Sequence, residues 1–158
     1  MIDVAVAVAL HVLAIVLWIG GAGFATLALL PALRHLPDPA QRIAMFEAME
    51  SRFAPVARAA ILLAGATGLY MAFRLNIWSW FTSVRTWWMG AMPVVWIIFA
   101  VLLFVLEPFF LHHRFIAHAK SAPDAAFRKA ERLHWMLLII SLVTILGAAA
   151  GTHGFVPG

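Results

Sequence analysis

Four apolar segments constrain this chain more than any other feature of its sequence. They cover residues 4–33, 55–73, 87–111 and 133–150, and each approaches or exceeds the roughly 20 residues that a helix needs to cross a bilayer. Hydrophobic residues make up 65% of the 158 residues and charged residues only 11%. Because lipid offers no partners to backbone groups, each segment must be a helix. The sequence therefore predicts an all-α, integral membrane four-helix bundle, formed as a single domain over residues 1–158.

Lys and Arg residues are distributed unequally over the connections between these segments. The first connection carries Arg34, Arg42, Arg52 and Arg58, the third carries Arg114, Lys120, Arg128, Lys129 and Arg132, and the second has only Arg74 and Arg85. Positively charged connections remain in the cytoplasm. We therefore expect a protein of the bacterial inner membrane with both termini periplasmic (N-out/C-out). This topology explains the basic composition, so we expect membrane lipid and not nucleic acid as a partner.

The first connection has a helix signal of its own. Residues 38–41, Asp-Pro-Ala-Gln, place a capping Asp before a Pro at the first helical position. Apolar residues then recur at helical spacing: Ile43, Phe46, Met49 and Phe53. This pattern predicts a short amphipathic cytoplasmic helix, ended by a kink or break at Ala54-Pro55. A similar start signal at residues 121–124 predicts that the fourth helix begins well before the membrane.

The second connection is rich in tryptophan, with Trp78, Trp80, Trp87 and Trp88. These residues are typical of an aromatic belt at one membrane interface, or alternatively of a lid over an outward-facing site. Small residues are spaced by four on the second helix (Ala60, Ala64, Gly68) and on the fourth (Gly147, Gly151). This spacing favours close helix packing, with room for a flat cofactor between helices as the alternative.

His11 is the only ionisable residue between Asp3 and Arg34. At 1.5 Å per residue it lies on the order of 10 Å below the outer start of the first apolar segment. Ionisable groups inside a bilayer are costly and usually functional, and imidazole is a ligand for iron, copper and zinc. We predict that His11 binds a cofactor or handles protons. The alternative is a structural hydrogen bond to a neighbouring helix.

Several residues in the outer half are candidates to complete a site with His11. The chain has no cysteine, so His and Met are the remaining soft or borderline metal ligands. The candidates are Trp18 on the same helix face, His153 as a second axial ligand, Met89 and Met92 as further ligands, and Arg74 and Arg85 as partners of haem propionates. Each has a simpler alternative: Trp18 and the methionines as packing residues, and His153 as a solvated tail residue.

Polar residues near the cytoplasmic side form a separate group. Glu107 is the one carboxylate inside an apolar segment, and we expect it to pair with Arg58, Arg34 or His134, with a proton relay as the alternative. The other histidines of this group are His112, His113 and His118. They are typical of an interface with lipid headgroups, although His113 and His134 together also suggest a second metal or haem.

The segment from Leu10 to Gly21, LHVLAIVLWIGG, is followed by Pro31-Ala-Leu. It resembles the first helix of the copper-resistance protein D-like membrane domain and of the four-helix bacterial protoporphyrinogen oxidase, which binds haem b. Both families carry His, then Trp seven residues later, then Gly. Over the other helices the likeness is one of topology and length. This chain differs from the oxidase family at two places. Met92 stands where that family has Lys, and residues 133–135, Leu-His-Trp, stand where that family has Asn-Glu-Pro.

The resemblance to the oxidase implies that His11 takes the haem-ligand position. The resemblance to the copper-resistance domain implies copper ligation by His11, Met89, Met92 and His153. We therefore expect a haem b protein with an electron-transfer or redox role; a quinone or another redox partner and a haem-dependent oxidoreductase activity are further candidates. The alternatives are a copper-handling membrane protein and a structural or assembly subunit without cofactor. A homodimer that shares a site is compatible with each.

Overall fold

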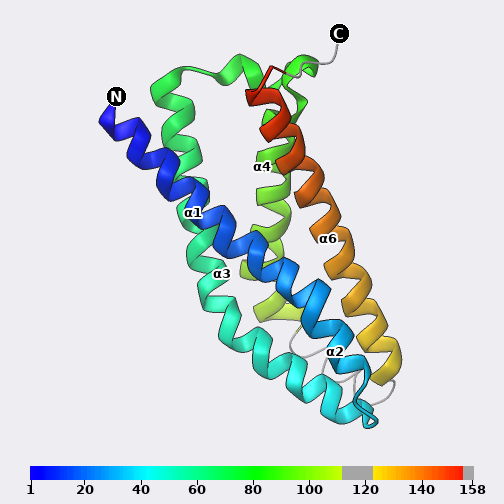
Figure 1. Cartoon of the computed structure of the whole chain (residues 1–158). Coiled ribbons are helices and arrows are strands. Elements are labelled where there is room, and N and C mark those ends of the chain that lie inside the picture. The colour runs from blue at the N-terminus through cyan, green and yellow to red at the C-terminus, as the bar shows by residue number, and fades with distance from the viewer. Residues whose placement is uncertain (112–122, 155–158) are drawn as a thin grey trace.

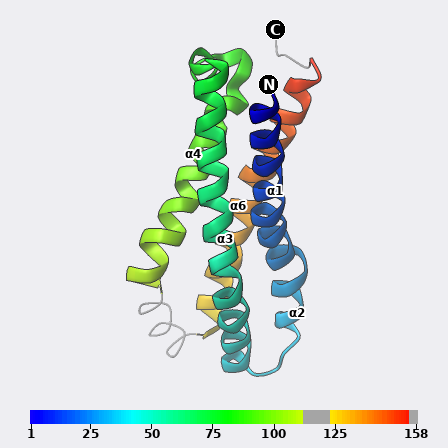
Figure 2. The ribbon, with the colours of Figure 1, turned by 90° about the vertical axis from the view of Figure 1, so that its left-hand side faces the viewer.

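The structure is a computed structural model that describes residues 1–111 and 123–154, and these residues form a bundle of helices (Figures 1 and 2). The elements are α1 (Ile2–Phe24), continued by the π-helical stretch η1 (Ala25–Leu29) and α2 (Leu30–Arg34); α3 (Pro39–Leu75); the short 3-10 turns η2 (Trp78–Phe81) and η3 (Val84–Thr86); α4 (Trp87–Val101), continued by the π-helical stretch η4 (Leu102–Leu111); and α6 (Pro123–Thr152). Four helical spans, Ile2–Arg34, Pro39–Leu75, Val84–Glu107 and Asp124–Thr152, are long and apolar enough to cross a membrane. The prediction of an all-α four-helix bundle is confirmed.

The bundle consists of two helix pairs. Helix α1 packs mainly along α3, and α4 packs mainly along α6. Helix α1 begins and α6 ends at one end of the bundle, together with the connection from α3 to α4, and we call this the upper end (Figures 1 and 2). In the lower half α6 packs against α2 and α3, and toward the upper end the two pairs separate (Figure 1).

The core lies where the two pairs meet. Ala14 of α1 and Ala60 and Ala64 of α3 are buried there, and their small side chains let the two backbones approach closely. Trp18 of α1 packs edge-to-face on Phe99 of α4, with ring centroids 4.8 Å apart. In lipid the water-driven hydrophobic effect does not drive association between helices, so this close packing supplies the attraction. The small-residue spacing on α3 therefore serves helix packing.

Helix α3 differs from its prediction in one respect. Asp38 caps it as expected, because its Oδ1 accepts a hydrogen bond from Ala40 N at 2.9 Å. The helix then continues from Pro39 to Leu75, so the predicted break at Ala54-Pro55 was wrong. Proline removes one backbone donor and crowds the carbonyl four residues before it. Ala54 and Ala57, buried on either side of Pro55, pack in the bundle and keep the helix continuous through that loss.

The amphipathic start of α3 packs against the lower ends of its neighbours. Phe46 clusters with Leu30 and Leu33 of α2 and with Phe127 of α6, while Ile43 meets Ala126. Two ion pairs, Arg34–Glu131 and Arg42–Asp124, join the same elements. At 1.5 Å per residue, α3 is about 55 Å long, longer than the roughly 30 Å hydrocarbon core. This start is therefore the amphipathic helix of the prediction, joined without interruption to the second span.

Prolines accompany both π-helical stretches. Pro31 follows η1 directly, and Pro108 lies within η4. A proline cannot donate to the carbonyl four residues earlier, and its ring crowds that carbonyl. A wider π turn relieves this crowding without ending the helix. The first span thus continues through Pro31, which would otherwise break it.

Candidate functional site

His11 joins α1 to α3. Its Nδ1 lies 3.0 Å from the backbone oxygen of Ala64 and 2.9 Å from Oγ1 of Thr67. The Thr67 hydroxyl donates to Leu63 O at 2.6 Å, so its oxygen is free to accept. A carbonyl oxygen can only accept, and we therefore assign the proton to Nδ1 of His11. One ring nitrogen is thus fixed by two acceptors on α3.

The other ring nitrogen of His11 has a different environment. In the uncharged imidazole, Nε2 carries a lone pair and no proton. Within residues 1–111 and 123–154, Nε2 has no hydrogen-bond partner and is not fully enclosed. Metal-ligating histidines usually donate from one nitrogen to a carbonyl or carboxylate and bind the metal through the other. His11 has the first half of this arrangement.

Gly68 provides the space for the His11 ring. A Cβ at position 68 would lie 3.2 Å from Cε1 of His11, tighter than ordinary packing. Helix α3 therefore presents a carbonyl, a hydroxyl and a glycine to one imidazole. From the sequence, Gly68 was identified only as one of the small residues spaced by four, and Thr67 was not identified. A hydroxyl three residues after the small residue Ala64, on the facing helix, is the signal that would have identified it.

Trp18 follows His11 by seven residues and is 5% exposed. It belongs to the central core through its contact with Phe99, so the packing interpretation describes its ring. Its Nε1 is fully buried and has no hydrogen-bond partner in the described part of the chain. A buried donor without a partner is costly, and this indole therefore has an unused hydrogen-bonding capacity.

Arg74, expected to meet a haem propionate, has a carboxylate partner within the chain. Its Nε and Nη2 donate to Oδ2 of Asp3 at 2.9 and 2.7 Å, and the Tyr70 hydroxyl donates to the same oxygen at 2.8 Å. This cluster was not predicted from the sequence, although Asp3 and Arg74 lie at the same predicted end. Arg85 is an exposed residue of η3.

The candidate second ligands lie on other helices than His11, at the start of α4 and the end of α6. His153 is exposed, and its Nδ1 donates to Ala149 O of its own helix at 2.7 Å. Met89 and Met92 are partly buried in the first turns of α4. Among the described residues, no group of three or more His, Asp or Glu is placed to hold a metal ion. The structure thus does not bring His11 and His153 into a multi-histidine metal cluster.

Trp87 and Trp88 fill the space beside the glycines of α6. A Cβ at position 147 would lie 2.6 Å from Cζ2 of Trp87, and a Cβ at position 151 would overlap the Trp88 ring. Trp88 is 6% exposed, whereas Trp78 and Trp80 are exposed. The predicted belt of four tryptophans was therefore wrong for Trp88, which packs inward on Gly151. The glycines of the fourth helix serve aromatic packing.

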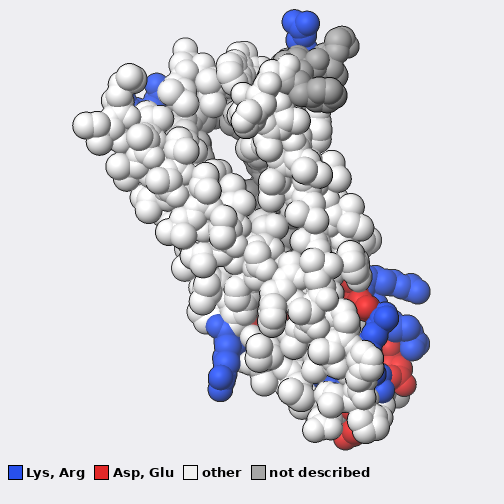
Figure 3. All heavy atoms as spheres, viewed as in Figure 1, with Lys and Arg blue, Asp and Glu red and all other residues white. Residues whose placement is uncertain are grey.

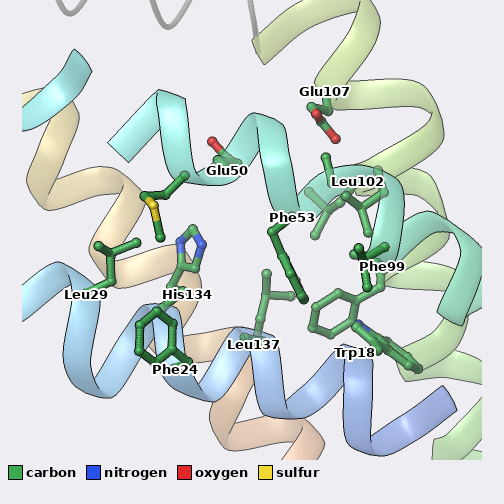
Figure 4. Close-up of a pocket in the computed structure, with 18 of the residues that line it drawn as sticks. Trp18, Phe24, Leu29, Glu50, Phe53, Phe99, Leu102, Glu107, His134 and Leu137 are labelled. Carbon is green, nitrogen blue, oxygen red and sulfur yellow. The ribbon is translucent and has the colours of Figure 1, made fainter. Parts of the chain in front are cut away.

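A cavity of about 450 Å³ lies below Trp18, bordered by α1, α3, α4 and α6 (Figure 4). Apolar side chains form most of its wall, and Glu50, Glu107 and His134 add polar groups. Arg58 and Glu107 form an ion pair, with Nη2 of Arg58 3.1 Å from Oε2 of Glu107. The two groups are not aligned for a hydrogen bond. The expected pairing of Glu107 with Arg58 is confirmed, and Arg34 pairs with Glu131 instead.

His134 borders this cavity and is oriented by its own helix. Its Nδ1 donates to Ala130 O at 2.9 Å, and its ring packs edge-to-face on Phe46 at 5.5 Å. The neighbouring cytoplasmic-side histidines of the sequence analysis, His112, His113 and His118, lie outside the described residues. The suggestion that His113 and His134 share a metal therefore stays a prediction.

The fold and the site define a class of protein: an all-α membrane bundle of four spanning helices with one histidine held between the first two. In comparisons with known proteins, no family model, no curated protein and no solved structure matches this chain. The relationship of this chain to the haem b oxidase family and to the copper-resistance domain, suggested by residues 10–21, stays a prediction.

Proposed function

We propose that this chain is a b-type haem protein of the bacterial inner membrane with an electron-transfer or redox role, in which His11 supplies an axial ligand. The observation that carries the proposal is the orientation of the imidazole. A purely structural histidine would use its ring to join helices, and the Nδ1 bonds to Ala64 and Thr67 accomplish this. In a purely structural histidine the unpaired Nε2 would lower the stability of the fold, because a polar atom in an apolar environment would lack a partner. Ligation to iron would give Nε2 that partner.

The shape of the upper half supports the same proposal. His11 lies nine residues below the start of α1, on the order of 14 Å from the upper end. In this half the surface is hollowed between the α1–α3 pair and the α4–α6 pair (Figure 3). Haem sites in helical bundles occupy such spaces between helices. When bound, haem would supply one-electron chemistry, and the chain would set its potential through the ligand and its burial.

The distribution of charge supports an orientation for this site. Lys, Arg, Asp and Glu gather at the lower end of the bundle, and the upper half is nearly free of them on the face shown in Figure 3. Under the positive-inside rule the lower end is cytoplasmic. His11 and the upper end then belong to the periplasmic half, and both termini are periplasmic. Arg85 remains a candidate propionate partner, while Arg74 would first have to leave Asp3.

Absorption spectroscopy of purified protein tests the proposal. The chain is expressed with a haem supply and its spectrum is recorded oxidised and dithionite-reduced. We expect a Soret band that shifts on reduction, and a fall in bound haem of at least about tenfold in His11→Ala. His35→Ala is the matched control, because His35 is exposed and bonds only Pro31 of its own helix. A wild-type protein without a Soret band, or an unchanged spectrum in His11→Ala, would refute the proposal.

A further inference from the structure

A groove of about 490 Å³ lies near the lower end of the bundle, between Arg34 at the end of α2 and the first half of α6. It shares no lining residue with the cavity below Trp18. Basic side chains project from the lower part of the bundle on the side of α6 (Figures 1 and 3). The groove is therefore a second concave surface of the molecule, and it has a different chemical character.

Arg128 and Arg132 supply positive charge to this groove. They lie four residues apart on α6, so they share one helix face and are about 6 Å apart along the helix axis. Both are exposed, and neither has an ion-pair partner within the described part of the chain. Asp124, the carboxylate one turn before Arg128, pairs with Arg42 instead. Two guanidinium groups are thus available to a ligand.

Glu131 is the one carboxylate on the described wall of the groove, and Arg34 already neutralises it. Its side chain is 9% exposed, whereas that of Arg34 is 59% exposed. Arg34 uses only Nη2 among its five N–H donors for this pair, within the described residues. Residues 112–122 and 155–158 contain no Asp or Glu that could add negative charge. Three arginines against one glutamate leave two positive charges in the groove.

The groove becomes apolar toward the upper end of the bundle. Trp135, Met136 and Ile139 continue its wall after the arginines, and all three are exposed. From Arg128 to Ile139 the helix rises about 16 Å. Tryptophan is typical of the membrane interface, and exposed apolar residues beyond it face acyl chains. The order along the groove, charged, then aromatic, then apolar, is the order of phosphate, glycerol and acyl chain in a phospholipid.

From these observations we infer that the groove is a binding site for an anionic phospholipid. Arg128 and Arg132 hold its phosphate, and an acyl chain lies along Met136 and Ile139. Guanidinium groups donate to phosphate oxygens in pairs of parallel hydrogen bonds. A zwitterionic lipid adds a cation beside its phosphate, and the two unpaired arginines repel that cation. Basic pockets between membrane helices on the cytoplasmic side are suited to anionic headgroups for this reason.

Native mass spectrometry of the purified full chain in detergent micelles tests this inference. The chain is titrated with dioleoylphosphatidylglycerol or with dioleoylphosphatidylcholine, which have the same acyl chains and differ in net charge. We expect the first phosphatidylglycerol to bind about tenfold more tightly than the first phosphatidylcholine. Glycerophosphoglycerol is the same headgroup without acyl chains. At equal concentration it should not displace the lipid, because it gains nothing from the apolar part of the groove.

Three single variants complete the experiment. Arg128→Gln and Arg132→Gln each remove one charge, and each should weaken phosphatidylglycerol binding about fivefold while phosphatidylcholine binding stays unchanged. Both positions are exposed, so neither change disturbs the core. Lys129→Gln is the matched control, because Lys129 is an exposed cation on the same turn of α6 that does not line the groove. It should leave the affinity within about twofold.

Three results would overturn the inference. Equal binding of the two lipids would identify an unselective lipid contact. Displacement by glycerophosphoglycerol at equal concentration would identify a site for soluble phosphates. An equal loss of affinity in Lys129→Gln and in the two arginine variants would identify a general attraction between a basic surface and an anionic lipid. All measurements are made with and without added haem, so the result for this groove is independent of the role of His11.

Discussion

At the scale of single residues, Thr67 decides how His11 is presented. Its hydroxyl proton goes to Leu63 O, so its oxygen accepts from His11 Nδ1 and fixes both the proton and the ring orientation. Interhelical hydrogen bonds in membranes contribute on average only about 0.6 kcal/mol. The main effect of Thr67 should therefore appear in ligand geometry rather than in stability.

Thr67→Val tests this role of Thr67. The change keeps the shape and removes the acceptor, and leaves Ala64 O as the single partner of Nδ1. We expect haem affinity to fall about tenfold and the reduced spectrum to shift, because partners of a ligating histidine tune its basicity. Thr144→Val is the matched control, since Thr144 is also buried but bonds only Ile140 O of its own helix. If both variants lower stability equally and neither changes the spectrum, His11 has only a structural role.

At the residue scale, the sequence identified single ionisable residues more readily than their partners: the pair of Glu107 with Arg58 was predicted, and other pairs were missed. His11 and Glu107 were identified because an ionisable group in an apolar run is conspicuous by itself. The bond to Thr67 was missed because it depends on the rotation of α3 about its axis, which spacing alone leaves open. The pairing of Arg74 with Asp3 was missed for the same reason, and a haem propionate was expected in its place.

At the scale of elements, the lengths of the apolar segments predicted the four spans. The start of the second helix was predicted wrongly, because a break was expected at Pro55. Pro55 is a helix breaker by propensity, yet α3 passes through it because buried alanines on both sides pack in the bundle. Tertiary packing overrides local preference where the lost hydrogen bond is a single one. The cap at Asp38 was predicted correctly because capping depends on neighbouring residues alone.

The contact of α4 with α6 gives a prediction at this scale. Gly151→Ala would place a methyl group into the Trp88 ring, which is buried and cannot move aside freely. Overpacking of this kind typically costs about 1–3 kcal/mol, so the variant should unfold at a lower denaturant concentration. Gly20→Ala is the matched control, because a Cβ at position 20 meets nothing within 4 Å. Equal midpoints for the two variants in a denaturation series by circular dichroism would contradict the packing role of Gly151.

At the scale of the whole molecule, one end of the bundle carries most of the charge and the other carries the histidine site (Figure 3). The cavity with Trp18 and His134 lies in the lower half, below His11 on the same helix bundle. His11 and this cavity therefore lie at different levels of the bundle. The topology of the chain decides on which side of the membrane His11 lies.

Topology can be measured directly because the chain contains no cysteine. Ser79 lies in η2 at the upper end and Ser51 near the start of α3, and both are exposed, so each can be replaced singly by cysteine. With the lower end cytoplasmic, a membrane-impermeant maleimide added to intact spheroplasts should label Ser79→Cys and leave Ser51→Cys unlabelled. After lysis both should react, which confirms that Ser51→Cys is accessible in itself. Labelling of Ser51→Cys alone in intact spheroplasts would invert the orientation and place His11 in the cytoplasmic half. A periplasmic haem site would then be untenable.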